Sequence, residues 1–147
     1  MGSHSARQRR PRPQVAAVTA VSCLVVAAFQ IALTLGAPLG AAALGGTITG
    51  QLPESLRLMT ALTALFWLLG TLVVLARGGI TIYPLPRTVA TWGTWVLVAL
   101  LGIATLLNFA SSSPWERFGW GHFSLTMLFL TIALARSRPP ADRTPSA

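Results

Sequence analysis

The arginines of this chain lie almost entirely between four long apolar segments, and the loops share them unequally. All 11 basic residues are arginines, and nine of them fall in the two termini and the middle loop. These nine are Arg7, Arg9, Arg10, Arg12, Arg77, Arg87, Arg136, Arg138 and Arg143. The other two loops carry only Arg57 and Arg117, each close to a glutamate. This alternation is the positive-inside pattern, and it predicts a multi-pass protein of the plasma membrane with both termini in the cytoplasm.

The four apolar segments are each close to the roughly 20 residues that a helix needs to cross a bilayer. We expect spans at residues 15–36, 58–76, 88–110 and 119–135. Open strands would leave backbone groups unpaired within the hydrocarbon, so the spans must be helices. The predicted fold class is all-α, a four-helix transmembrane bundle over residues 15–136. The tails at 1–14 and 137–147 are rich in proline and arginine, and we expect them to be disordered.

The composition argues against a soluble domain and against nucleic acid. Apolar residues make up 53% of the chain and charged residues only 10%, where a soluble domain has roughly 25%. The net charge is +8, but the arginines flank the apolar segments and most aromatic residues lie within or beside those segments. No basic and aromatic binding surface can be assembled from that arrangement. We therefore expect the arginines to meet anionic lipid, with no nucleic-acid partner.

The first outer loop, Ala37–Ser55, is long and rich in glycine. It is too weakly apolar and too interrupted to cross the membrane. Two interpretations are open: a re-entrant hairpin, or an interfacial flap laid over the bundle. The polar side chains of Thr47, Thr49 and Gln51 favour the flap because they prefer water to hydrocarbon.

The strongest polar groups near the spans converge on the outer side. At 1.5 Å per residue, Gln30 lies in the outer third of the first span and Asn108 near the outer end of the third. Amides in hydrocarbon usually face a protein partner or a water-filled cavity. We expect a pocket beneath the flap, with candidate substrate-binding residues Gln30, Arg57, Asn108, Arg117 and His122. The alternative is that both amides bond across helices, at about 0.6 kcal/mol each, and that the charges mark the water boundary.

The candidate catalytic residue is Glu116, which lies between large aromatic side chains in the segment Trp115–Trp120. Partial burial there would suit a general acid or a proton carrier. The alternative is that this segment forms an interfacial aromatic belt. The other outer glutamate, Glu54, is expected to pair with Arg57 on the first turn of the second span and to complement the helix dipole.

The chain shows no pattern typical of a metal or cofactor site. Its two histidines, His4 and His122, are far apart and no carboxylates cluster beside them. No phosphate-binding loop, nucleophile elbow or CxxC pair is present. We expect neither a metal nor a cofactor.

Three stretches resemble small four-span integral membrane proteins of high-GC Gram-positive bacteria. They are Gln30–Gly40 (QIALTLGAPLG), Leu52–Arg57 (LPESLR) and Asn108–Arg117 (NFASSSPWER). That group has no assigned activity, so the resemblance implies the four-span fold and no chemistry.

Three functions are compatible with these features. The favoured one is a non-catalytic accessory protein, or one that binds lipid or a lipophilic small molecule. The second is an intramembrane isomerase or cyclase, with Glu116 as acid or base and with Gln30 and Asn108 orienting the substrate. The third is a dimeric small-molecule transporter, against which the lack of any charge in mid-membrane counts. The expected partners are the bilayer, a lipophilic small molecule, and a second copy or a larger membrane complex.

Overall fold

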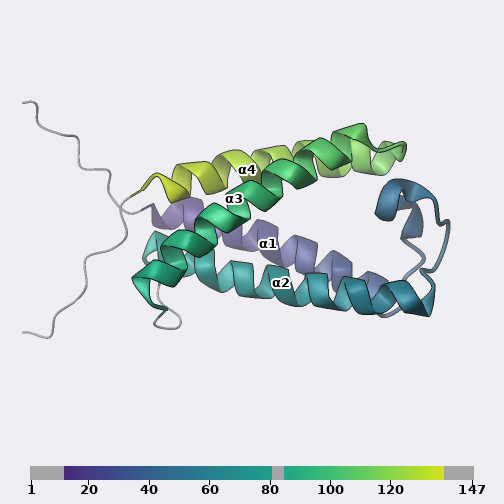
Figure 1. Cartoon of the computed structure of the whole chain (residues 1–147), viewed down its shortest axis with the longest axis horizontal. Coiled ribbons are helices and arrows are strands. Elements are labelled where there is room, and N and C mark those ends of the chain that lie inside the picture. Colours follow the sequence, from purple (N-terminus) through teal and green to yellow (C-terminus); the bar gives the residue numbers. More distant parts are fainter. Residues whose placement is uncertain (1–11, 81–84, 138–147) are drawn as a thin grey trace, which may run out of the picture.

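The computed structural model describes residues 12–80 and 85–137, which form helices and the loops between them (Figure 1). The long helices are α1 (Pro13–Thr34), α2 (Glu54–Gly78), α3 (Arg87–Ala110) and α4 (Gly121–Ala135). Each is long and apolar enough to cross a membrane, α4 together with the helical turn that precedes it. The predicted all-α fold with four such helices is confirmed. The tails predicted to be disordered lie mostly outside the described residues.

The ends of the helices follow the prolines and glycines of the sequence. α1 begins at Pro13 rather than Val15, and α2 begins at Glu54 rather than Leu58, directly after Pro53. Proline fits an early helical position because its fixed φ suits the helix and its missing N–H is not needed there. α2 ends where Gly79 adopts a left-handed conformation, with φ of +84°.

The four helices form two antiparallel pairs, α1 with α2 and α3 with α4. The pairs lie close together at the end where α1 begins and α4 ends, and they diverge at the other end (Figure 1). We call these the terminal end and the flap end. The flap, residues 35–53, contains the short helices η1 (Gly40–Ala42) and η2 (Leu44–Gly46). It lies between the diverging ends of the two helix pairs (Figure 1).

Small residues bring the helices together at the terminal end. Ala16 and Ala20 of α1 are buried against Val74 of α2, in a cluster that also includes Leu97 and Leu134. A Cβ atom added at Gly78 would overlap the side chain of Ala16. Close approach through small residues is the usual way in which helices associate in membranes, where the lipid is as apolar as leucine.

Arg77 joins the two helix pairs at the terminal end. Only 4% of the residue is exposed, and its Nη2 donates to the carbonyl oxygens of Ala135 (2.7 Å) and Ser137 (2.6 Å). These carbonyls form the negative end of the α4 dipole, which favours a cation. The sequence treats Arg77 as a topology charge, whereas the structure makes it an internal link between α2 and α4.

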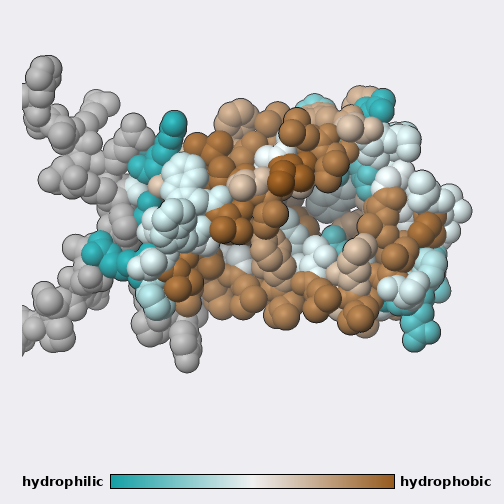
Figure 2. All heavy atoms as spheres, in the orientation of Figure 1, coloured by the Kyte–Doolittle hydropathy of each residue, from teal (hydrophilic) through white to brown (hydrophobic). Residues whose placement is uncertain are grey.

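The outer surface of the bundle is apolar between two polar ends (Figure 2). Large apolar side chains are exposed on every long helix, for example Val21 (60%), Leu62 (61%), Leu106 (73%) and Phe129 (64%). An apolar surface of this extent is typical of a protein that contacts lipid. The arginines outside the described residues are Arg7, Arg9, Arg10, Arg138 and Arg143.

The contact at Gly78 gives a first prediction. Replacing Gly78 with alanine should push α1 and α2 apart and lower the free energy of unfolding by about 1–3 kcal/mol, the usual cost of overpacking. The matched control is Gly102→Ala on α3, because a Cβ atom there meets nothing within 4 Å. That control should be neutral, or stabilising by up to about 1 kcal/mol through helix propensity. Unfolding in detergent measures both, and equal stability of the two variants would contradict the close contact.

Candidate functional site

A cavity of about 360 Å³ lies at the flap end, between the two helix pairs and beneath the flap. All four long helices, the flap and the turn before α4 contribute to its wall. The space-filling view shows the hollow on the face where α2 and α3 lie in front (Figure 2). Its volume is within the range of cavities that bind small organic molecules.

Aromatic rings form much of the wall. Trp120 packs on Phe29 of α1 with ring centroids 4.7 Å apart, and its edge meets Phe123 of α4 at 5.6 Å. Across the cavity, Phe66 and Trp67 of α2 form a second edge-to-face pair at 5.5 Å. All five rings line the cavity. Rings of this kind give a rigid apolar wall with negative faces and positive edges.

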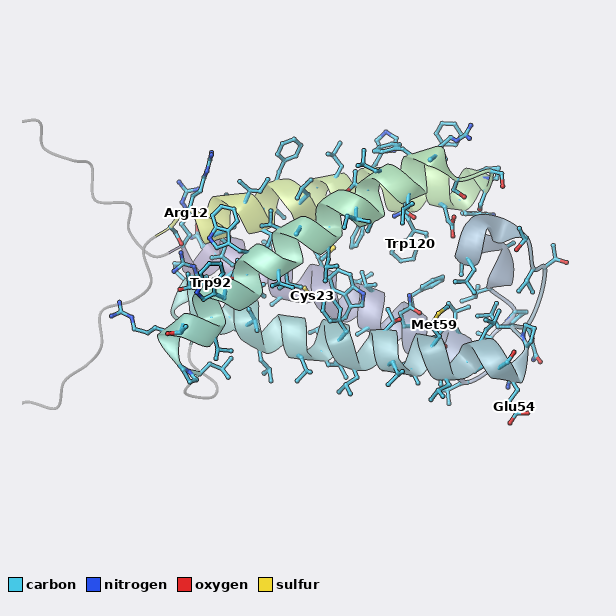
Figure 3. All side chains as sticks on the ribbon, in the orientation of Figure 1. Arg12, Cys23, Glu54, Met59, Trp92 and Trp120 are labelled. Carbon is cyan, nitrogen blue, oxygen red and sulfur yellow. The ribbon has the colours of Figure 1, made fainter. Side chains whose placement is uncertain are left out.

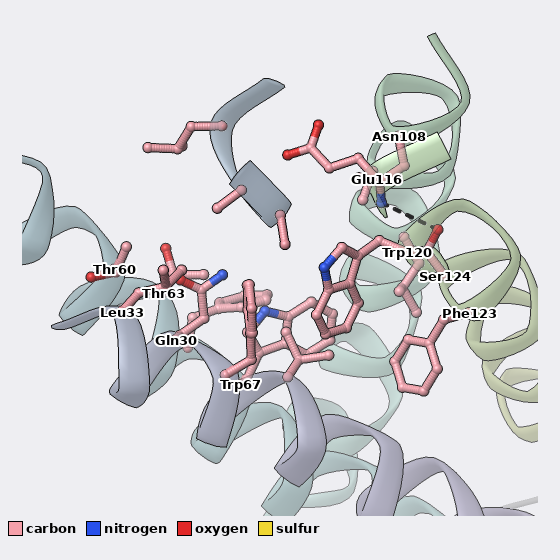
Figure 4. Close-up of a pocket in the computed structure, with 18 of the residues that line it drawn as sticks. Gln30, Leu33, Thr60, Thr63, Trp67, Asn108, Glu116, Trp120, Phe123 and Ser124 are labelled. Atoms are coloured by element: carbon pink, nitrogen blue, oxygen red, sulfur yellow. Dashed lines mark hydrogen bonds between the residues drawn. The ribbon is translucent and has the colours of Figure 1, made fainter. Parts of the chain in front are cut away.

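The two amides predicted to form the pocket floor both line the cavity, from opposite sides (Figure 4). Asn108 of α3 donates from Nδ2 to Ser124 Oγ of α4 at 3.5 Å, which is a long hydrogen bond. Gln30 of α1 has no side-chain hydrogen bond within the described part of the chain, and its amide faces the cavity. The alternative in which both amides bond across helices therefore applies to Asn108 alone.

Glu116 lines the cavity and also holds the flap. It is 8% exposed, and the backbone N–H of Gly45 in the flap donates to both of its oxygens, at 3.0 and 3.2 Å. Two neighbouring serines add to this contact. Ser113 Oγ donates to the carbonyl of Ala41 at 2.7 Å, and Ser112 Oγ donates to the carbonyl of Gly45 at 3.2 Å. These three contacts, which we call the flap latch, tie residues 41–45 to the loop before α4.

Glu116 and Trp120 lie four residues apart on one helical turn, and both line the cavity. The segment η3 (Trp115–Trp120) is a π-helix, in which the N–H of Gly121 donates to the carbonyl of Glu116. Such turns are rare and often occur at functional sites. Trp115 and Phe118 remain 68% and 69% exposed, as aromatic-belt residues would be, whereas Trp120 lines the cavity.

The flap is packed as well as latched. Leu33 of α1 forms a buried cluster with Ala43 and Leu52 of the flap. Gly46 has a φ of +69°, and a Cβ atom there would lie 2.7 Å from the Cβ of Ser113, so glycine is needed on both counts. Leu44, which lines the cavity, also has a positive φ of 52°. A non-glycine residue in this conformation is strained and is held by its surroundings.

Arg57 is not part of the cavity wall, and its predicted ion pair with Glu54 is absent. Its Nε donates to the carbonyl of Leu52 at 3.1 Å, and its Nη2 donates to Gln51 Oε1 at 3.4 Å. The guanidinium thus turns back to the flap, where backbone carbonyls need donors, while Glu54 is exposed.

Arg117 and His122 also lie outside the cavity wall. Arg117 Nε donates to the carbonyl of Ser111 at 3.0 Å rather than pairing with Glu116. His122 is exposed, with its ring edge-on to Phe109 and its Nδ1 3.0 Å from the carbonyl of Phe118. Three of the six predicted site residues, Gln30, Asn108 and Glu116, are therefore brought to one cavity.

Several wall residues were not predicted from the sequence. Met59, Thr60, Thr63, Phe66 and Trp67 all lie on α2 and line the cavity. Their spacing of three and four residues places them on one helical face, which is the only signal that could have grouped them. The same spacing is equally typical of helix packing, so it does not identify a site.

Comparison with known proteins gives no information about the site. No family model, no curated protein and no solved structure matches the chain. The resemblance to small four-span proteins therefore stays a prediction. Within residues 12–80 and 85–137, no group of three histidine, cysteine or acidic side chains is placed to hold a metal ion.

The flap latch gives a second prediction. Replacing Glu116 with alanine should leave the N–H of Gly45 without its acceptor and weaken the folded flap by about 1–3 kcal/mol. Limited proteolysis in detergent should then cut the flap faster than in the wild type. Glu54→Ala is the matched control, because Glu54 is exposed and makes no such contact. Equal cleavage rates in the two variants would show that Glu116 does not hold the flap.

Proposed function

We propose that this chain is a multi-pass protein of the plasma membrane that binds a lipophilic small molecule without transforming it. The observation that carries this proposal is the cavity at the flap end. Its wall combines five aromatic rings with the amide of Gln30, which has no protein partner in the described part of the chain. An apolar cavity with a few polar groups is the usual form of a small-molecule site.

The distribution of arginines supports placing the flap end in the outer leaflet. Arg12, Arg77, Arg87 and Arg136 lie at or next to the helix ends that form the terminal end. Arginine-rich loops face the cytoplasm, so the termini are cytoplasmic in this proposal. The cavity is then in the outer half of the membrane, beneath a flap at the outer surface.

A sideways opening supports a ligand that arrives from the bilayer. Met59 of α2 and Leu100 of α3 line the cavity and are also 46% and 41% exposed. They lie on the two helices that frame the hollow, and the stick view places Met59 near the flap (Figure 3). A molecule dissolved in the lipid can therefore reach the cavity between α2 and α3 without crossing the flap.

The cavity favours binding over catalysis or transport. Among the described residues, Glu116 is the one acid or base that lines the cavity, and the exposed His122 lies outside it and supplies no second one. Proton transfer in an isomerase or cyclase requires such a group within hydrogen-bond reach of the substrate. At the terminal end, buried side chains such as Leu97 and Leu134 pack together, so the cavity lies at the flap end alone among the described residues.

Native mass spectrometry of the gently extracted protein tests the proposal. The wild type should carry a bound lipid or small molecule, and the double variant Gln30→Leu, Asn108→Leu should lose at least about 90% of it, because the polar contacts are gone. The matched control is Gln14→Leu, Thr126→Leu, which replaces two exposed polar residues outside the cavity. A ligand-free wild type, or equal loss in both double variants, would refute the binding site.

A separate experiment tests the orientation. Cys23 is the only cysteine and is buried, so a Cys23→Ala background is suitable for labelling. A membrane-impermeant maleimide added to intact cells should label Thr49→Cys in the flap and leave Ser3→Cys unlabelled. The reverse pattern would place the flap in the cytoplasm.

A further inference from the structure

We propose that the ligand is a lipophilic cation, an amine or a quaternary ammonium compound, whose charge is held by Glu116 and Trp120. This inference rests on the proposed binding function and names the chemical class of its ligand. It follows from three features of the cavity: a buried carboxylate without a cationic partner, adjacent aromatic faces, and a wall that contains no basic residue.

The first feature is the unbalanced charge of Glu116. The residue is 8% exposed, and its described hydrogen-bond partner is the single N–H of Gly45, shared between the two oxygens. A carboxylate can accept about four hydrogen bonds, so most of its capacity is unused. Its position in the first turn of a helix offsets part of the charge. Arg117 turns away to Ser111, and no ion pair links Glu116 to another described residue.

The second feature is the aromatic surface beside that carboxylate. Trp120 follows Glu116 on the same π-helical turn, and both side chains line the cavity (Figure 4). Phe29 and Phe123 pack on Trp120, which holds the indole in place. Tryptophan is the best aromatic partner for a cation, and aromatic cages are the usual site for quaternary ammonium groups.

The third feature is that the charge on the cavity wall is negative only. Glu116 is the only charged residue among the described side chains that line the cavity, since Arg57 and Arg117 lie outside it. In an apolar surrounding of low dielectric, a carboxylate attracts a cation and repels an anion far more strongly than in water. The apolar remainder of the wall accommodates a hydrocarbon or aryl body. An amphiphilic cation therefore fits the cavity better than a fatty acid or a neutral isoprenoid.

A matched set of ligands tests this class directly. Phenylbutyltrimethylammonium is the cationic probe, its tert-butyl isostere with carbon in place of nitrogen is the neutral probe, and phenylbutanesulfonate is the anionic probe. Each is titrated against the full chain in uncharged maltoside micelles, and the dissociation constant is taken from the rise in unfolding temperature with concentration. We expect the cation to bind at least about tenfold more tightly than either of the other probes.

Two variants assign the preference to the named residues. Glu116→Gln retains an oxygen that can accept from Gly45, so the flap stays latched while the charge is removed. It should abolish the tenfold preference and leave the affinity for the neutral probe unchanged. Trp120→Leu should weaken the binding of the cationic probe about fivefold or more relative to that of the neutral probe. Glu54→Gln, which removes an exposed glutamate, should behave as the wild type.

Equal affinity for the cationic and neutral probes in the wild type would overturn the inference. So would a cation preference that survives Glu116→Gln while the neutral probe still binds. Neither result would refute the proposal that the cavity binds a small molecule. That proposal is tested separately, by mass spectrometry of the Gln30→Leu, Asn108→Leu variant. Failure of all three probes to stabilise the wild type would also reject a lipophilic cation as the ligand.

Discussion

The two helix pairs are closely joined at only one end, and the link made by Arg77 is central to that junction. Its guanidinium is buried and reaches from the end of α2 to the last carbonyls of α4, while its Nε and Nη1 have no acceptor among the described residues. A buried cation that is only partly satisfied is costly unless the surrounding structure holds it in place. Here Gly78 and Ala16 provide that support by allowing α1 and α2 to approach closely. These contacts hold the pairs together at the terminal end, and the pairs diverge toward the flap end (Figure 1).

That divergence accounts for both the cavity and the flap. Most hydroxyl side chains in the spans bond to a carbonyl of their own helix, as Thr19, Thr94 and Thr131 do. Such bonds satisfy the side chain without drawing helices together. At the flap end the pairs diverge, and residues 42–44 line the cavity between them, in a flap that is held by the latch at Glu116. Gln30 differs from these hydroxyls because its amide has no hydrogen-bond partner among the described residues.

The sequence predicts the elements well because the bilayer imposes long apolar helices, and prolines and glycines mark their ends. It also places Gln30 and Asn108 at the same depth, since rise per residue determines depth. It does not distinguish which arginine is buried: Arg77 and Arg87 both flank spans, yet Arg77 is buried against the end of α4 whereas Arg87 is exposed. Nor does it predict the rotation of the turn before α4. An α-helical register and the observed π-helical one orient Trp115, Glu116 and Trp120 differently, and only tertiary packing selects between them.

The position of Glu116 links the flap to whatever occupies the cavity. One N–H of the flap uses part of the hydrogen-bonding capacity of the carboxylate, and Glu116 lines the same cavity as Trp120. A cation placed there would neutralise a charge that otherwise stands buried, so it would stabilise the inward position of Glu116. Since the same side chain holds Gly45, that stabilisation extends to the closed flap. By thermodynamic reciprocity, a latched flap must then favour the bound cation to the same degree. The proposed cation and the flap would thus be coupled through a single carboxylate.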